Sequence, residues 1–301
     1  HMLMTVTKEQ LRELELNEDI LFVQEVETNE LSLHKSVPIV EAEQLWARGW
    51  SGRDYCVAVL DTGCSNTHEM LKESIVDEYC FSGNDGNNLN HSLCPNKESK
   101  QSGKNAARPP SGSSFDGGGG HGTHVAGIIC GRSVYKGCAP CSSIVPMQVF
   151  SNIENNLRAY DSDILNAIVK VFEIREKYNI VAVNMSLSGG EYKDICDSKN
   201  PAYKNAFDML RSVNIVPVVA SGNQYLKNAI GSPACISSAI AVGATKNDES
   251  ITTFTNMNTK VQLVAPGYKI KSAWPYGDKY KELSGTSMAT PHVVSAFLLL
   301  R

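Results

Sequence analysis

The sequence lacks the features that mark several specialised classes of protein. No apolar run approaches the ~20 residues that a helix needs to cross a bilayer. The N-terminus has no basic start followed by an apolar stretch, as a secretory signal would have. Lys and Arg number 28 against 32 Asp and Glu, which gives a net charge of −4. This balance gives no case for nucleic acid or an anionic membrane as a partner.

Cysteine, in contrast, is abundant, with nine residues, an odd number. Cys56 and Cys130 lie in apolar runs, which predicts buried thiols that behave as small hydrophobic residues. Cys80 and Cys94 flank a polar loop and can pair, but a sequence does not fix the geometry that a disulfide needs. The compartment stays open on these grounds, with secretion favoured over the cytoplasm.

Two further cysteines form the segment Cys138-Ala-Pro-Cys141, which has the spacing of a redox motif or of half a zinc site. A structural zinc ion needs four ligands, and neither a second C-x-x-C nor a Cys–His pair at ligand spacing is present. No metal site is therefore predicted.

From Trp46 onward, short apolar runs alternate with helical patterns. Continuous runs of Val, Ile and Ala are typical of strands that are buried on both faces. Strands that alternate with helices predict an α/β fold of three layers, a mostly parallel sheet with helices on both faces. Reactive groups then gather at the carboxyl ends of the strands. The predicted strands are Cys56–Leu60, Ile144–Phe150, Ile180–Leu187, Ile215–Ala220, Ala239–Thr245 and Val261–Ala265.

Two stretches between these strands carry an amphipathic pattern. Ser162–Lys177 has an apolar stripe at helical spacing, and Asp161 or Ser162 can cap its start. Ala202–Arg211 is a second, shorter predicted helix.

The chain is predicted to consist of a charged N-terminal extension, residues 1–35, and one main domain, residues 36–301. Residues 82–120 form a long polar insertion rich in Gly, Ser and Asn. A loop of this length is either functional or mobile. We interpret it as a solvated loop, the alternative being a segment that restricts access to the neighbouring His121 or binds a partner.

Three segments each place one reactive side chain at the edge of a predicted element. Asp61 directly follows a buried strand, where an unpartnered carboxylate is costly. His121 lies among small residues in Gly120–Gly127, and Ser287 lies at the start of an apolar helix in Ser284–His292. Taken alone, the three are equally consistent with a turn, a structural histidine and a helix cap.

Taken together, in the order Asp, His, Ser, the segments resemble the subtilisin-like serine proteases, the subtilase or peptidase S8 family. The resemblance runs from about Val37 to Arg301. It implies the three-layer subtilisin-like fold and a serine endopeptidase that hydrolyses peptide bonds through an acyl-enzyme. Ser287 would be the nucleophile, His121 the general base and then acid, and Asp61 the group that orients the imidazole.

The resemblance also implies a substrate site. Asn223 would donate its side-chain amide to the oxyanion, together with the backbone N–H of Ser287. Gly231 would leave room at the floor of the S1 pocket for a large apolar side chain, and extended substrate would lie along the first wall as an added strand. The two walls of that pocket would be Ser186, Leu187, Ser188 and Gly189, and Ala220, Ser221 and Gly222.

Other positions depart from the family pattern. Family members often bind calcium, but Met70 stands where a carboxylate is expected, and the loop Gly131–Gly137 is short for an ion that needs six to eight oxygens. The usual calcium site is therefore predicted to be absent, a calcium site elsewhere stays open, and catalysis is expected to need no cofactor. Residues 1–35 resemble part of a propeptide or are an N-terminal extension that covers the cleft. Either would be self-inhibitory, and the alternative is a surface strand. The chain ends within the helix that Ser287 begins, so the domain is expected to be C-terminally incomplete.

Two alternatives to hydrolysis stay open. A peptide transpeptidase or macrocyclase on the same scaffold would pass the acyl group to an amine, with residues 82–120 excluding water. A pseudoprotease would only bind peptides, which the intact set Asp61, His121, Asn223 and Ser287 disfavours. In each case the partner is a peptide or protein substrate, with no nucleic acid and no membrane.

Overall fold

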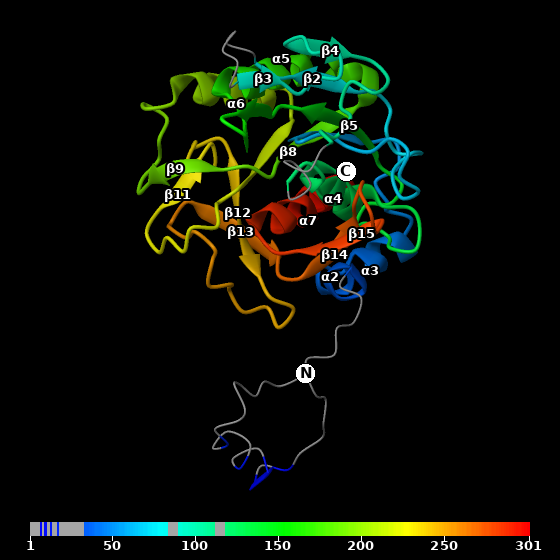
Figure 1. Cartoon of the computed structure of the whole chain (residues 1–301), viewed down its shortest axis with the longest axis vertical. Coiled ribbons are helices and arrows are strands. Elements are labelled where there is room, and N and C mark those ends of the chain that lie inside the picture. Colours follow the sequence, from blue (N-terminus) through cyan, green and yellow to red (C-terminus); the bar gives the residue numbers. More distant parts are fainter. Residues whose placement is uncertain are drawn as a thin grey trace. The chain divides into compact units, whose positions relative to one another are not determined.

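The structure is a computed structural model that describes residues 33–83, 90–111 and 118–301, together with Thr7, Glu9, Gln10, Glu13 and Asn17. The chain divides into two compact units, His1–Leu31 and Ser32–Arg301. Most of the predicted N-terminal extension, residues 1–35, thus lies outside the described residues. The fold described below is that of the second unit (Figure 1).

All six apolar runs predicted as strands are strands of one sheet. They are β1 (Cys56–Asp61), β5 (Ser143–Gln148), β8 (Ile180–Met185), β10 (Val216–Ala220), β12 (Ile240–Thr245) and β13 (Val261–Pro266). With β2 (Tyr79–Phe81) and β4 (Lys100–Ser102) they form an eight-stranded sheet in the order β13-β12-β10-β8-β1-β5-β2-β4. Neighbouring strands are parallel except for β2 and β4. The carboxyl ends of the parallel strands therefore meet at one edge.

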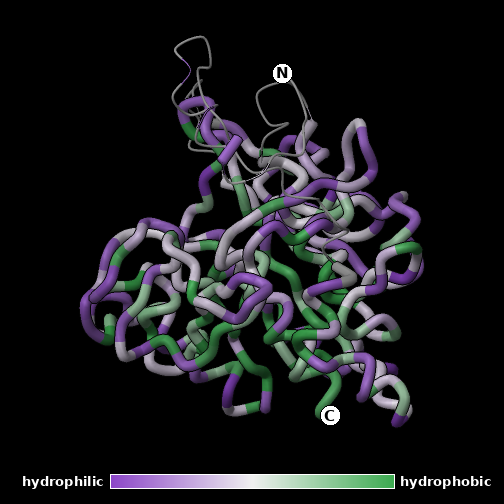
Figure 2. The backbone as a smooth tube through the Cα atoms, turned by 90° about the horizontal axis from the view of Figure 1, so that it is seen from below, coloured by the Kyte–Doolittle hydropathy of each residue, from purple (hydrophilic) through white to green (hydrophobic). Residues whose placement is uncertain are grey.

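Helices cover both faces of this sheet, which confirms the three-layer α/β fold. The helices on one face are α4 (His121–Cys130) and α7 (Thr286–Leu299), with α2 (Leu33–Ile39) and α3 (Ala42–Ala47); those on the other are α5 (Asp161–Tyr178) and α6 (Pro201–Ser212). Each face of the sheet has its own hydrophobic core. Within β1, Val57 and Val59 belong to the core on the side of α4 and α7, whereas Ala58 and Leu60 belong to the core on the side of α5 and α6. This alternation follows from the two-residue period of a strand. Figure 2 shows the apolar segments gathered inside and the hydrophilic ones on the outer loops.

Helix α5 begins one residue earlier than predicted, and its predicted cap is wrong. Tyr160 is the N-cap residue and forms no side-chain cap bond. The carboxylate of Asp161 instead accepts a hydrogen bond from the hydroxyl of Tyr203 on α6 (2.8 Å), and that of Asp163 accepts one from the backbone N–H of Gly83 (2.6 Å). Tertiary partners thus replace the local cap. The second predicted helix is α6, one residue longer at each end.

Among the described residues, three small sheets lie outside the main one. β9 (Gly189–Tyr192) pairs with β11 (Ile230–Ser232), and β14 (Ile270–Ala273) pairs with β15 (Tyr280–Leu283). The third contains β3 (Asn90–Ser92), β6 (Ser151–Ile153) and β7 (Asn156–Arg158), in that order. None of the described helices is both long enough and apolar enough to cross a membrane.

The interpretation of residues 82–120 as a solvated loop is wrong for one part of the segment that the structure describes. Strand β4 extends the main sheet, and Ala106 and Ala107 are fully buried. The carbonyl oxygen of Ala107 accepts a hydrogen bond from the backbone N–H of Cys64 (2.8 Å), close to the end of β1. The insertion is anchored because its backbone groups pair with the sheet and with the loop after Asp61.

Two disulfides stabilise loops in this unit. Cys80 and Cys94 are bonded (S–S 2.02 Å), as the sequence allowed, and Cys196 and Cys235 form a second pair that was not predicted. The free cysteines are Cys56, Cys64, Cys130, Cys138 and Cys141. The prediction that Cys56 and Cys130 are buried thiols is confirmed, and burial raises the pKa of Cys130 to about 12.

Candidate active site

Asp61 and His121 meet at the carboxyl edge of the sheet. Asp61 is the last residue of β1 and is 1% exposed, and His121 is the first residue of α4. The Nδ1 atom of His121 lies 2.8 Å from Oδ1 and 3.0 Å from Oδ2 of Asp61. Because a carboxylate accepts, Nδ1–H is the donor, and Nε2 keeps its lone pair.

Two small residues hold α4 against the end of β1. A Cβ atom on Gly122 would collide with the carbonyl oxygen of Gly63 and would lie 2.9 Å from the Cβ of Asp61. The hydroxyl of Thr62 donates to the carbonyl of Gly119 (2.9 Å) and accepts from the N–H of Gly122 (3.0 Å). The glycine beside the histidine thus serves a close backbone approach.

The ring of His121 lines an open cleft at this edge of the sheet, and a quarter of its side-chain surface is exposed. Burial, the largest influence, lowers the pKa of His121, but the negative charge of Asp61 and its hydrogen bond together outweigh burial. The pKa is therefore raised above its ordinary value of about 6.5.

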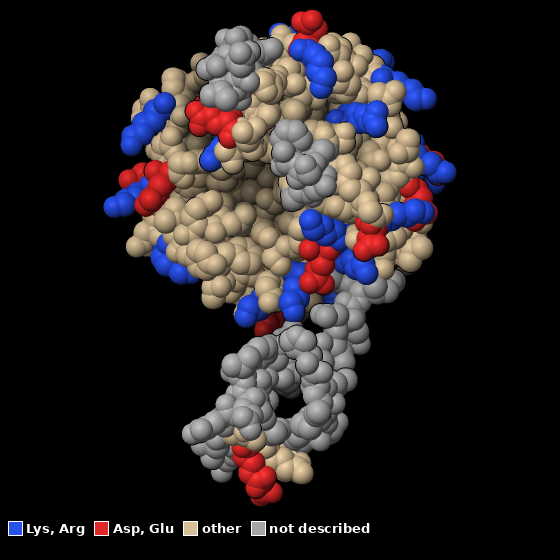
Figure 3. Space-filling model, in the orientation of Figure 1, with Lys and Arg blue, Asp and Glu red and all other residues tan. Residues whose placement is uncertain are grey.

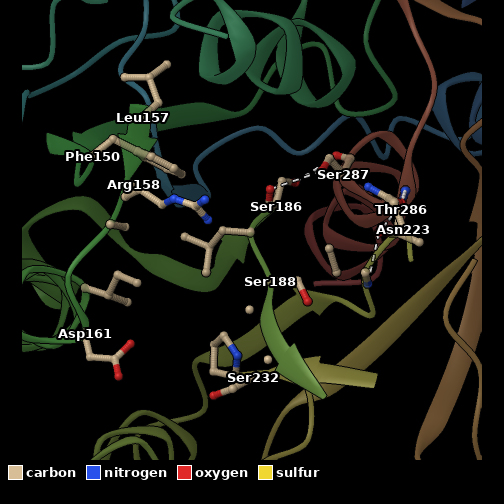
Figure 4. A pocket seen from close by; sticks show the side chains of 18 of the residues that line it. Phe150, Leu157, Arg158, Asp161, Ser186, Ser188, Asn223, Ser232, Thr286 and Ser287 are labelled. Carbon is tan, nitrogen blue, oxygen red and sulfur yellow. Dashed lines mark hydrogen bonds between the residues drawn. The ribbon is translucent and has the colours of Figure 1, made fainter. Parts of the chain in front are cut away.

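Ser287 is the second residue of α7 and lines the same cleft as His121. Its hydroxyl donates to the carbonyl oxygen of Ser186 (3.1 Å), and the hydroxyl of Ser186 donates to the carbonyl of Ser287 (2.8 Å), as Figure 4 shows. The side-chain amide of Asn184 on β8 donates to the Ser186 hydroxyl (3.0 Å). This chain of bonds ties the start of α7 to the end of β8.

Asn223 has the orientation that an oxyanion donor needs. Its Oδ1 atom accepts hydrogen bonds from the backbone N–H (2.8 Å) and the hydroxyl (3.0 Å) of Thr286, so its other terminal atom, Nδ2, is the free donor. A Cβ atom on Gly285 would lie 3.2 Å from this Nδ2 and 3.6 Å from the backbone nitrogen of Ser287. Both predicted oxyanion donors therefore lie beside Gly285, at the positive end of α7.

The cleft has a volume of about 590 Å³, and Figure 3 shows a hollow on this face with mostly uncharged walls. Of the predicted substrate-binding residues, six line it: Ser186, Leu187, Ser188, Gly189, Ala220 and Gly222. Gly189 also begins β9, where it pairs with Ser232 of β11.

Two residues predicted to form the S1 pocket do not line the cleft. Ser221 is fully buried, and its hydroxyl donates to the carbonyl of Asn256 (2.8 Å), away from the cleft. A Cβ atom on Gly231 would collide with the hydroxyl of Ser188. The sequence had suggested that Gly231 leaves an open pocket floor for a substrate side chain. In the structure the glycine instead makes room for Ser188, so this prediction is wrong.

Several residues of the cleft were not predicted. Thr62 binds the start of α4, and Thr286 orients the amide of Asn223. Both lie inside the sequence motifs that carry Asp61 and Ser287, and this position could have indicated their role. The wall opposite Ser186 comes from the segment after β5 and from β7, which no sequence pattern had indicated. The unpredicted residues of the cleft lining include Phe150, Leu157, Arg158, Asp161, Tyr192 and Tyr203.

The position expected to bind calcium has an apolar side chain. Met70 is 1% exposed, and a Cβ atom on Gly131 would collide with its terminal methyl group. The thioether thus fills the space against Gly131, and it offers no hard oxygen ligand. Among the described residues, no three His, Cys, Asp or Glu side chains are grouped to hold a metal ion.

Comparisons with known proteins agree with this geometry. A family model described as the subtilase family matches residues 52–301. The chain is 32% identical over 292 residues to the major intracellular serine protease of Bacillus subtilis (strain 168), covering 95% of this chain and 78% of that protein. It is 30% identical over 270 residues to subtilisin DY of Bacillus licheniformis, covering 88% and 82%. The crystal structure of a cold adapted subtilisin-like serine proteinase superposes with a TM-score of 0.60 at 29% identity, covering 83% of this chain and 76% of that one.

Proposed function

This chain belongs to the subtilase family and is a serine endopeptidase, and we propose that Ser287, His121 and Asp61 are the groups that carry out the reaction. The observation that carries the proposal is the bond between His121 Nδ1 and Asp61, which leaves Nε2 as a base in the cleft that Ser287 also lines. The substrate is a peptide or protein, as for any protease of this family.

The proposed reaction begins when the Ser287 hydroxyl leaves the carbonyl of Ser186. Rotation about Cα–Cβ from one staggered position to another turns Oγ toward His121. Oγ passes its proton to Nε2 and attacks the carbonyl carbon of the substrate. The C–N bond then breaks as Nε2 passes that proton to the departing amine. Water releases the acyl group by the same steps in reverse order, and Asp61 stabilises the imidazolium each time.

Asn223 Nδ2 and the backbone N–H of Ser287 are the proposed donors to the oxyanion. Their proximity around Gly285 and the fixed orientation of the Asn223 amide support this role. Donors set in place by the fold need no reorganisation when the negative charge develops, and this makes them effective in the transition state.

Every group in this scheme belongs to the protein, so we propose that catalysis needs no cofactor. The packing of Met70 against Gly131 supports the absence of a calcium ion at that place, because a buried thioether is a poor ligand for a hard cation. Self-inhibition by residues 1–35 stays a proposal of the sequence, since most of that segment lies outside the described residues.

We also propose that the chain works in an oxidising compartment. Its two disulfides support this, because disulfides persist in secreted and extracellular settings. Relatives include a protease named as intracellular, so compartment varies within the family. Counting free thiols in protein from its native source tests the proposal. Five are expected, and nine would contradict it.

A fluorophosphonate probe tests the proposed function, because it reacts only with an activated serine. We expect one label, on Ser287, located by mass spectrometry of the digested protein. His121→Ala should label far more slowly, since the base is gone. Labelling at another serine, or equal labelling of the His121→Ala protein, would contradict the assignment. The peptide products should end in free carboxylates, whereas cyclic or ligated products would indicate a transpeptidase.

The pH profile of kcat/KM is expected to report the pKa of His121. Protonated imidazole cannot accept the Ser287 proton, so activity should fall as pH falls through that pKa, with a midpoint above the ordinary value of about 6.5. In Asp61→Asn the negative charge that raises the pKa of His121 is gone, so the midpoint should move to lower pH. The rate of fluorophosphonate labelling at a series of pH values measures this midpoint. A wild-type midpoint at or below 6.5 would contradict the geometry.

A further inference from the structure

Arg158 lies in the cleft, opposite the serine that contacts the nucleophile. It is the last residue of β7 and lines the cleft with Phe150 and Leu157. Figure 4 shows its guanidinium directed into the cavity, toward Ser186. Ser186 to Ser188 belong to the proposed S1 wall, so the space between that wall and Arg158 receives substrate residues that precede the scissile bond.

The strand that carries Arg158 is fixed in place by several contacts. β6 and β7 are joined by Glu154 and Asn155, both with positive φ (51° and 61°), as in a two-residue type I′ hairpin turn. Arg158 is paired with Ser151 in the register of these strands. The hydroxyl groups of Ser151 and Ser82 are 3.0 Å apart. A side chain that is carried by a rigid hairpin can present its charge at a defined position.

The guanidinium has no acidic partner among the ion pairs of the described residues. Among the described residues that line the cleft, Asp161 is the one other Asp, Glu, Lys or Arg. Its carboxylate accepts the hydroxyl of Tyr203 and lies well apart from the guanidinium in Figure 4. Among the described residues, nothing acidic therefore pairs with the positive charge that Arg158 presents to whatever enters this part of the cleft.

We propose that Arg158 is a specificity-determining residue that selects substrates with an acidic side chain, Asp or Glu, at one of the positions preceding P1. The proposal rests on the proposed function, because it takes the cleft to be the substrate site. The planar guanidinium binds a carboxylate through two parallel hydrogen bonds. Substrate would cover Phe150 and Leu157 at the same time and exclude water, which strengthens the pairing.

The preference is expressed by the ratio of kcat/KM between matched substrates. The experiment uses peptides that are identical except for Glu, Gln or Lys at one of the three positions preceding P1. For the wild-type chain, we expect Glu to exceed Gln by about tenfold at one of these positions, the size of effect that a charge-assisted hydrogen bond gives. Added salt should reduce the ratio, because ions screen the attraction.

Variants separate this role from a general effect of charge. Arg158→Ala should bring the ratio of kcat/KM for the Glu and Gln peptides to about one. Arg158→Glu should make the Lys peptide the preferred substrate. Arg211→Ala removes the same charge from α6, outside the cleft lining, and should keep the wild-type ratio. The proposal is overturned if the wild-type chain shows no preference at any of the three positions, or if Arg158→Ala retains it. Failure to cleave any of the peptides, with no labelling of Ser287, would instead overturn the proposed function on which it rests.

Discussion

Replacement of Ser287 by alanine is expected to lower kcat by about 10⁶-fold, the size of loss found when the same triad is disabled in a subtilisin. The hydroxyl is the one protein group in the proposed scheme that forms a covalent bond to the substrate, so the acyl-enzyme cannot form without it. The fold should survive, because the change removes one part-buried hydrogen bond, to Ser186, that is worth about 1 kcal/mol. The measurement is kcat on a chromogenic peptide, with circular dichroism to verify folding.

The triad should behave as a unit, which gives the control. His121→Ala alone should cost nearly as much as the double variant with Ser287→Ala, since either change disables the same step. Asn223→Ala should cost only about 10²–10³-fold, because it removes one of two oxyanion donors and leaves the nucleophile active. If the losses for Ser287→Ala and His121→Ala multiplied in the double variant, the two residues would not share one proton transfer.

Much of the fold could be predicted from the sequence because its strands are buried on both faces. Such strands appear as short, continuous apolar runs, and all six runs are strands of the main sheet. The positions of Asp61, His121 and Ser287 followed from parallel pairing, which brings the ends of β1 and β8 and the starts of α4 and α7 to one edge. Gly122 was a reliable signal, because only glycine allows the approach to Gly63.

Other features depend on tertiary contacts that leave no periodic trace. The disulfide between Cys196 and Cys235 spans 39 residues, and nothing local distinguishes these cysteines from the five free ones. The hairpin that carries Arg158 turns at Glu154 and Asn155, and glutamate is an unusual residue at positive φ, so the turn was missed. The room at Gly231 is taken by the hydroxyl of Ser188, a contact that only packing reveals.

Two buried histidines are expected to make the protein lose stability steeply in mild acid. His124 and His292 are 0% and 2% exposed. Burial, with a smaller effect of His121, lowers the pKa of His124 to about 3, and burial lowers that of His292 to about 4. In His124, Nε2–H donates to the carbonyls of Ile270 and Lys281 (3.0 and 2.9 Å), and in His292, Nδ1–H donates to the carbonyl of Met288 (2.8 Å).

The second ring nitrogen of each histidine is buried without a partner in the described structure, so a proton there would have no acceptor. The unfolded chain binds these protons near pH 6.5, whereas the folded chain binds them only near pH 3 to 4. Stability is thus complete above pH 6.5 and is lost as pH falls, by about 1.4 kcal/mol per pH unit for each histidine. By pH 4.5 the loss should reach about 5 kcal/mol, a large share of the stability of a domain. His121, whose pKa is raised, adds stability that is lost only as pH rises through that pKa, so it does not offset the acid loss.

Urea unfolding at a series of pH values measures this effect, with Ser287→Ala as the host so that the protein does not digest itself. His292→Asn keeps a donor for the carbonyl of Met288 but cannot titrate. Between pH 6.5 and 4.5, its free energy of unfolding should fall by about 2 kcal/mol less than that of the host. Parallel curves for the two proteins would mean that His292 does not control acid stability. The difference in slope is informative even if the substitution itself lowers stability, because a packing defect shifts the whole curve without changing its dependence on pH.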